Sequence, residues 1–308
     1  MKIKPLKKLS LSLVALLSIS LSSTGSTADF NTQLKTLTQQ TASVNDFIGK
    51  KPVYLKFWAS WCQPCMKEMP HLQKSFDEHG EEIEIFSINI DLNETDQAIN
   101  DVIKQFNLTL PTYKDDNGKL AKSLDFVGTP YHVLVDIDGD VVHKGHEANE
   151  DLDRKLAILA NKQQNKLPTI TLESATGKSS NLAFRDDTYT ALYLTATWCD
   201  WYLKDSRPQM SKSCVDGQNA IKQLSQQYKD VNWQILTSHL WTTKEDLTKY
   251  INKYQLDLPT KIDSKGDAFF SYKVKDLSTL ILFKGNKLIA RSSDPKQFTL
   301  LLKKHSAI

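Results

Sequence analysis

Residues 53–65 read VYLKFWASWCQPC, an apolar run followed by two cysteines three positions apart. The apolar run predicts a buried strand, and the residues after it predict an amphipathic helix that begins at Cys62. Backbone amides and the dipole at a helix start stabilise a thiolate there. Cys62 is therefore the predicted nucleophile. Cys65 shares a helical face with Met69 and Leu72, so it is the predicted buried, resolving thiol.

Two other kinds of cysteine chemistry fit this motif less well. A zinc site usually needs a second Cys/His pair at ligand spacing, and the chain has no second CxxC. A peroxidase also uses a nucleophilic cysteine, but no Thr-x-x-Cys pattern ends at Cys62. The motif predicts dithiol redox chemistry, with no metal and no other cofactor.

The first 28 residues have the pattern of a cleavable secretory signal. They contain four lysines, an apolar run from about Leu9 to Leu21 and a small polar tail that ends at Ala28. A retained membrane anchor is the alternative, but the apolar run is broken by serines and shorter than the ~20 residues that span a bilayer. We expect a periplasmic or otherwise exported protein, in a compartment where disulfides persist.

The charge of the remaining chain excludes one class of partner. Residues 1–28 hold four of the 39 Lys and Arg residues and none of the 36 Asp and Glu residues, so residues 29–308 carry a formal charge of −1. A near-neutral surface gives no electrostatic reason to bind nucleic acid or a membrane. The length allows two domains with separate cores, and the sequence does not set an oligomeric state.

The second half of the chain repeats landmarks of the first. They recur at offsets of 137 to 148 residues: FWASWC at 57–62 against LTATWC at 194–199, LPT at 110–112 against LPT at 258–260, and 127–135 against 274–282. This duplication predicts two domains, at residues 29–165 and 166–308. The polar stretch 161–166 at the join fits either a helix tail or a flexible linker.

The hydrophobic pattern of the first half predicts alternating strands and helices. Near-continuously apolar strands are typical of a sheet covered by helices on both faces. The predicted strands are 52–59, 82–90, 131–137 and a short one ending at Lys144, and the predicted helices are 62–79, 95–107 and 149–162.

The stretch FWASWCQPC, with Pro130 before a buried strand, resembles the thioredoxin superfamily. The continuation CMKEMP at 65–70 is similar to exported TlpA/ResA-like thiol-disulfide oxidoreductases. The resemblance covers residues 42–162 and is a fold-level likeness over 168–308. It implies α/β architecture with tandem thioredoxin-like folds, each a central mixed sheet flanked by helices.

The resemblance also implies an activity and a substrate site. Cys62 would attack a protein disulfide and Cys65 would resolve the mixed disulfide. The Thr129–Pro130 bond would be cis, which leaves the backbone of Thr129 free to pair with a substrate chain. A membrane-linked electron donor is a further candidate partner.

Four residues around the cysteines are candidates for a supporting role. Lys56 lies inside the buried strand and Glu68 follows Cys65 by three residues, matching the active-site glutamate of the ResA-like branch. They fit either two side chains that reach water or a partly buried pair that tunes the thiols. Pro64 influences the redox potential without fixing it, and Trp61 is expected in the core, as is Trp198.

The second half departs from the catalytic pattern. Tyr202 stands at the CxxC spacing from Cys199, and Leu277 is expected at the place of Pro130. We therefore expect a degenerate thioredoxin-like domain that serves for substrate docking or dimerisation, with Trp201 as a candidate surface contact.

Three interpretations of Cys199 and Cys214 are open. A disulfide suits an exported protein, but 15 residues of straight helix would span ~22 Å, so the bridge needs a helix break such as Arg207-Pro208. In the second interpretation Cys199 and Cys214 are thiols that are either free or exchange with Cys62 and Cys65. In the third they bind a metal ion together with His239. For the whole chain, the alternative to an enzyme is a binding or scaffold protein with structural disulfides.

Overall fold

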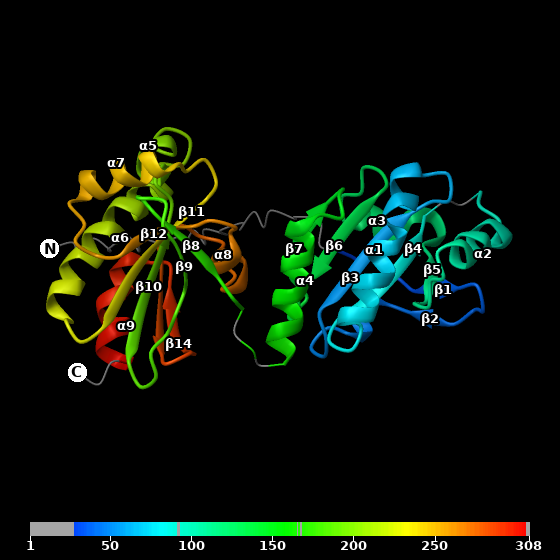
Figure 1. The fold of residues 1–308 in the computed structure, drawn as a ribbon, viewed down its shortest axis with the longest axis horizontal. Coiled ribbons are helices and arrows are strands. Elements are labelled where there is room, and N and C mark those ends of the chain that lie inside the picture. Colours follow the sequence, from blue (N-terminus) through cyan, green and yellow to red (C-terminus); the bar gives the residue numbers. More distant parts are fainter. Residues whose placement is uncertain (1–27, 91–92, 165, 167, 306–308) are drawn as a thin grey trace, which may run out of the picture.

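The computed structural model describes residues 28–90, 93–164, 166 and 168–305. Each half of the chain forms one seven-stranded mixed sheet with helices packed against it (Figure 1). No helix in these ranges is long and apolar enough to cross a membrane. Apart from Ala28, the predicted signal segment lies outside the described residues.

The first sheet has the order β2-β1-β5-β4-β3-β6-β7, in which β3, β4 and β5 are parallel and β6 runs antiparallel to β3. Its strands are β1 Leu34–Thr36, β2 Thr41–Ala42, β3 Val53–Trp58, β4 Glu84–Asn89, β5 Thr112–Lys114, β6 Tyr131–Val135 and β7 Val141–Gly145. Its helices are α1 Gln63–His79, α2 Asp96–Gln105, α3 Lys119–Ser123 and α4 Glu150–Gln163, with short 3-10 helices η1 Val44–Asp46 and η2 Asp116–Gly118.

Alternation along β3 sends its side chains into two cores. Tyr54 and Trp58 pack with apolar residues of α1, α2 and α4 on one face. Leu55 and Phe57 pack with residues of α3 and β6 on the other. Lys56 has the parity of Tyr54 and Trp58, so it faces the helix that carries the cysteines.

The second sheet has the order β14-β13-β10-β11-β12-β8-β9, which matches the first sheet strand for strand. The predicted tandem duplication is confirmed. Its strands are β8 Thr171–Ser174, β9 Ser179–Asn181, β10 Tyr189–Thr195, β11 Asn232–Ser238, β12 Thr260–Asp263, β13 Thr279–Lys284 and β14 Lys287–Ser292. Its helices are α5 Cys199–Tyr202, α6 Pro208–Gln227, α7 Lys244–Tyr254, α8 Asp267–Ser271 and α9 Phe298–His305, with 3-10 helix η3 Pro295–Gln297.

Charged side chains join the two halves. Arg154 of α4 pairs with Asp267 of α8, 3.3 Å apart, and Lys162 of α4 donates to the carbonyl oxygen of Ser271 at 2.5 Å. In Figure 1, α4 lies between its own sheet and the second half of the chain. The helix ends at Gln163, so the polar stretch 161–166 begins as a helix tail.

Candidate active site

Cys62 and Cys65 form a disulfide at the start of α1. Cys62 is the N-cap residue, and its sulfur accepts a hydrogen bond from the Cys65 amide at 3.2 Å. Pro64 lies in the first turn of the helix. A proline lacks a backbone N–H group, but the N–H groups of the first turn have no partner within the helix, so no hydrogen bond is lost there. Cys65 is fully buried, as predicted, but Cys62 is only 4% exposed. The helix begins where the sequence predicts it. The predicted nucleophile Cys62, however, has little solvent-exposed surface.

A buried ion pair lies on the same face of α1 as Cys65. Glu68 follows Cys65 by three residues, and its carboxylate contacts the ammonium of Lys56, which reaches it from β3. The Lys56 side chain has no exposed surface and Glu68 is 18% exposed. Of the two interpretations that the sequence left open, the structure shows the partly buried pair rather than two solvated side chains.

His132 completes this cluster, and the sequence analysis missed it. Its Nε2 lies 3.2 Å from the Glu68 carboxylate and 3.1 Å from the Lys56 ammonium. The Tyr54 hydroxyl lies 2.7 Å from its other ring nitrogen. This geometry fits a neutral ring that accepts from Tyr54 and donates to Glu68. The sequence feature that could have identified His132 is that it is a polar residue inside an otherwise apolar strand. The register of β6 then places it directly opposite Lys56.

Burial and mutual charge shift the pKa values in this cluster. Burial lowers the pKa of Lys56 to about 8, although Glu68 opposes the change. Burial alone would raise the pKa of Glu68, but hydrogen bonds from His132 and Lys56, the Lys56 charge and the Ala148 amide lower it to about 2. Burial lowers the pKa of His132 to about 4. At neutral pH the site therefore holds a carboxylate, a neutral imidazole and an easily deprotonated ammonium.

Resistance to acid is expected to depend on His132. Between pH 6.5 and about 4 the unfolded chain binds a proton that the buried ring does not. The contribution of the neutral His132 ring to the free energy of unfolding is therefore complete above pH 6.5 and is lost as the pH falls towards 4. The free energy of unfolding decreases by at most about 1.4 kcal/mol per pH unit in this range. Urea denaturation across this range measures the slope. The variant His132→Leu should give a shallower slope, and equal slopes in both proteins would contradict the assignment.

The Thr129–Pro130 peptide bond is cis, as expected, and it directly precedes β6. The ring of His146 hydrogen bonds to the Pro130 carbonyl oxygen at 2.7 Å. The backbone groups of Thr129 make no hydrogen bond to any described residue. An incoming extended chain therefore finds an unpaired donor and acceptor at this loop.

The expectation that Trp61 belongs to the core is wrong. Trp61 follows the end of β3 in a turn and is 64% exposed. Trp58, still inside the strand, is the buried tryptophan, and its indole donates to Ser87 Oγ at 2.9 Å. Trp198 of the second domain is half-buried rather than a core residue, and Trp201 is 61% exposed, as its surface interpretation requires.

Strand register corrects the expected match of Leu277 to Pro130. In the first sheet Tyr131, which follows Pro130, lies opposite Phe57. In the second sheet Thr279 lies opposite Leu194, the counterpart of Phe57. Ser278 therefore stands at the place of Pro130, and Leu277 stands at the place of Thr129. The expected match followed the offset of 147 that aligns residues 127–135 with 274–282, whereas the strand register follows the offset of 148 that the LPT repeat shows.

Cys214, not Tyr202, is the counterpart of Cys65. Cys199 and Cys214 form a disulfide, with a helix break between α5 and α6. Three residues after Cys214, Gly217 lies so close to Ser278 Oγ and the Tyr193 hydroxyl that a Cβ there would clash with both. The second domain thus keeps its disulfide in place, with a longer segment between the two sulfurs. Both sulfurs are bonded, so the metal-site and free-thiol interpretations are wrong for this structure.

Among the described residues, no charged side chain of the second domain stands at the positions of Lys56, Glu68 and His132. Register places Tyr193 at the position of Lys56 and Leu280 at that of His132, and Gly217 takes the position of Glu68. The Tyr193 hydroxyl lies 3.1 Å from Ser278 Oγ, which donates to the Ser213 carbonyl oxygen at 2.9 Å. The hydroxyl groups of Tyr193 and Ser278, both neutral, thus replace the Lys56–Glu68–His132 cluster of the first domain.

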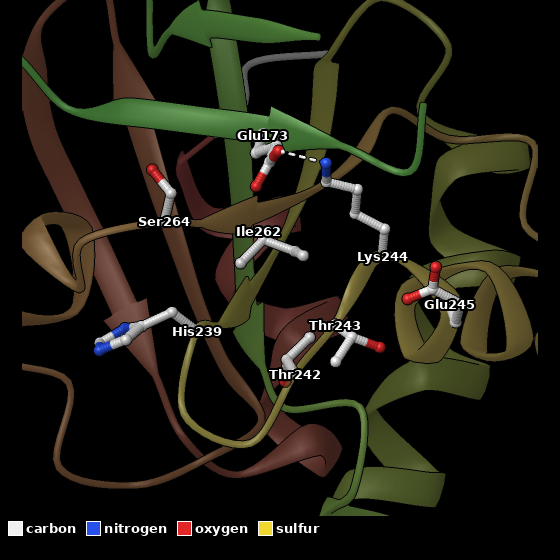
Figure 2. A pocket seen from close by; sticks show the side chains of 8 residues that line it. All are labelled: Glu173, His239, Thr242, Thr243, Lys244, Glu245, Ile262 and Ser264. Atoms are coloured by element: carbon white, nitrogen blue, oxygen red, sulfur yellow. Dashed lines mark ion pairs between the residues drawn. The ribbon is translucent and has the colours of Figure 1, made fainter. Parts of the chain in front are cut away.

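A shallow cavity of about 460 Å³ in the second domain carries no comparable chemistry. Figure 2 shows its side chains projecting from strands, a loop and the start of α7, with an ion pair between Lys244 and Glu173. The two charged groups lie 3.2 Å apart. Within the described residues, no cluster of His, Cys, Asp and Glu could hold a metal ion. The Cys62–Cys65 site is therefore the strongest candidate for catalysis.

The order of strands, the CxxC disulfide at a helix start and the cis-proline loop together define a thioredoxin-like domain. Residues 25–144 also match the model of the AhpC/TSA family. The first half of this chain therefore has a thioredoxin-like fold, and over residues 25–144 it is similar to that family.

Its curated relatives include thiol-disulfide oxidoreductases of the ResA group. ResA of Bacillus thuringiensis subsp. konkukian (strain 97-27) is 37% identical over 116 residues, which cover 37% of this chain and 65% of the relative. Sporulation thiol-disulfide oxidoreductase A of Bacillus subtilis (strain 168) is 33% identical over 95 residues, or 30% of this chain and 57% of the relative. The crystal structure of StoA from Bacillus subtilis aligns at 29% identity with a TM-score of 0.34, covering 37% of this chain and 85% of that chain.

Proposed function

We propose that this protein is an exported thiol-disulfide oxidoreductase that reduces protein disulfides through Cys62 and Cys65. The observation that carries the proposal is a CxxC disulfide at the start of α1, on the helical face that also bears a buried Lys56–Glu68 pair. The names of the relatives support the reaction class. The lysine-rich, apolar N-terminal segment supports export.

The reaction follows from thiol exchange. The Cys62 thiolate attacks a substrate disulfide, forms a mixed disulfide and releases one substrate thiolate. Cys65 then loses its proton and attacks Cys62, which releases the second substrate thiolate. The substrate gains two electrons and two protons, and the enzyme disulfide forms. A protein dithiol, such as a membrane-linked donor, must then reduce the Cys62–Cys65 bond for another turnover.

We propose that Glu68 tunes the acidity of Cys65 or relays its proton in the second step. It lies three residues from Cys65 on one helix and remains ionised at neutral pH because its pKa is about 2. Its carboxylate is held by the Ala148 amide at 2.9 Å and by the Lys56 ammonium. Both contacts hold a negative charge on the helical face of Cys65, where it disfavours the Cys65 thiolate and so tunes its acidity.

Replacing Glu68 by glutamine is expected to change the pH dependence of the thiols. Loss of a nearby negative charge should lower the pKa of the reduced cysteines by about one unit or more. Alkylation rates of Cys62 and rates of disulfide reduction, each measured against pH, test this shift. Glu81→Gln, at an exposed position beyond α1, is the control. Identical profiles for Glu68→Gln and the native protein would remove Glu68 from the mechanism.

A redox titration with thiol mapping tests the proposed function against the scaffold alternative. The Cys62–Cys65 disulfide should be reduced at a potential near those of other exchange catalysts, and Cys199–Cys214, which lacks counterparts of Lys56, Glu68 and His132, is an internal reference. Reduced protein should also cleave the disulfides of insulin, and Cys62→Ser should not. A Cys62–Cys65 potential below about −300 mV, typical of structural disulfides, together with no insulin reduction, would favour the scaffold.

A further inference from the structure

A second cavity, of about 680 Å³, lies beside the disulfide of the second domain. Leu203, Met210 and Leu277 line it and also pack around Cys199 and Cys214. We call it the aromatic cavity, because Trp198, Tyr202 and Trp241 form its walls. The proposed catalytic cysteines do not line it.

The three aromatic rings contact one another and face solvent. Trp198 lies 5.3 Å from Trp241 and 6.1 Å from Tyr202, measured between ring centroids, and its indole donates to the Leu240 carbonyl oxygen at 2.7 Å. Trp241 is 74% exposed and Tyr202 is 58% exposed. Exposed aromatic clusters of this kind are typical of binding sites, so the cavity offers a rigid surface for an apolar side chain.

The charges at the aromatic cavity favour an acidic ligand. Arg207 and Lys275 are among its lining residues, and none of the described residues that line it is Asp or Glu. Lys275 is paired with Asp140 of the first domain at 3.3 Å. The Arg207 side chain is exposed and has no ion-pair or hydrogen-bond partner among the described residues. A ligand carboxylate would therefore find an unpaired guanidinium beside the rings.

The backbone beside the rings favours a polypeptide over a small acid. Leu277 lines the cavity, and its N–H and C=O groups make no hydrogen bond to any described residue. An extended chain can pair with this free edge while its side chains enter the cavity. A small aromatic acid would leave both groups unpaired.

We propose that the aromatic cavity binds an extended polypeptide segment in which an aromatic or aliphatic side chain is followed by a carboxylate. Binding uses the rings for the apolar side chain, Arg207 for the carboxylate and the Leu277 backbone for the peptide groups. Binding of this kind requires no thiol exchange, since none of the three contacts uses a sulfur atom. The site therefore does not depend on the proposed catalytic function.

Calorimetric titration of the full chain with cysteine-free peptides tests this site. We expect Ac-Ala-Ala-Phe-Leu-Glu-Glu-amide to bind at least tenfold tighter than Ac-Ala-Ala-Phe-Leu-Lys-Lys-amide, and tighter than N-acetylphenylalanine. Trp241→Ala should weaken the acidic peptide at least tenfold, and Arg207→Glu should remove the preference for it. Both side chains are exposed, so both variants should fold, as circular dichroism can verify.

Two exposed residues elsewhere in the second domain provide matched controls. Leu300→Ala and Arg185→Glu should bind the acidic peptide as the native protein does. The proposal fails if the acidic peptide does not bind, if the basic peptide binds equally well, or if the cavity variants behave like the controls. Equal affinity for N-acetylphenylalanine would show a small-molecule site instead. These outcomes do not depend on Cys62, so they leave the proposed reductase activity to its own test.

Discussion

Serine at position 65 is expected to convert the protein into a trap for its substrates. Cys62 would still attack a substrate disulfide, but without the Cys65 thiol the mixed disulfide would persist. Adducts that dithiothreitol releases should accumulate on Cys65→Ser in an exported cell fraction, while turnover falls to the uncatalysed rate. Nonreducing electrophoresis followed by peptide mapping detects the adducts and identifies their attachment site.

The double variant Cys62→Ser/Cys65→Ser is the control for this experiment. It should form no adducts, because the remaining pair, Cys199 and Cys214, is oxidised and buried. Adducts attached at Cys199 or Cys214 would show that the second domain exchanges disulfides. An absence of adducts on Cys65→Ser would count against protein disulfides as substrates.

Replacing Lys56 by methionine is expected to give the largest loss of stability. The Lys56 side chain is fully buried, and its removal leaves the Glu68 carboxylate without its cation. Breaking a buried pair from one side costs about 3 kcal/mol or more. Amide exchange of β3 and β4 reports on the first domain alone and measures the change in its opening free energy.

Two further variants separate the ion pair from general effects of the substitution. Lys74→Met removes an exposed partner of Glu78 on α1, where the two charges lie 3.7 Å apart, and should cost less than about 0.5 kcal/mol. The double variant Lys56→Met/Glu68→Leu should recover much of the loss, since it leaves no unpaired charge. Equal costs for Lys56→Met and Lys74→Met would show that the buried pair contributes nothing special.

Sequence patterns predicted the catalytic half well because its signals are local. The apolar run before Cys62 and the face shared by Cys65 and Met69 fix a strand, a helix and their order. The short strands β1, β2 and β5 were missed, since two or three residues carry no detectable period. His132 was also missed, because its place opposite Lys56 depends on strand register.

The second half was harder because spacing along the chain misled. The segment between Cys199 and Cys214 is longer than a CxxC turn, so Tyr202 occupied the expected position while the true partner lay further on. Leu277 was matched to Pro130 because the apolar repeat was aligned at an offset of 147, one residue away from the strand register. Register and the disulfide supply the positions that residue counting cannot.

Ion pairs between the two domains affect how a client polypeptide could contact both the Cys62–Cys65 site and the aromatic cavity at the same time. Lys273 pairs with Asp136 and Asp138 in the β6–β7 turn, close along the chain to the loop that carries Leu277. Asp136 also accepts the Asp138 amide at 3.0 Å, which orders that turn. These ion pairs connect the loop that carries Leu277 to the turn after β6, the strand that follows Pro130. A client protein anchored at one site can present a disulfide to the other only if the intervening residues are long enough to reach from one site to the other.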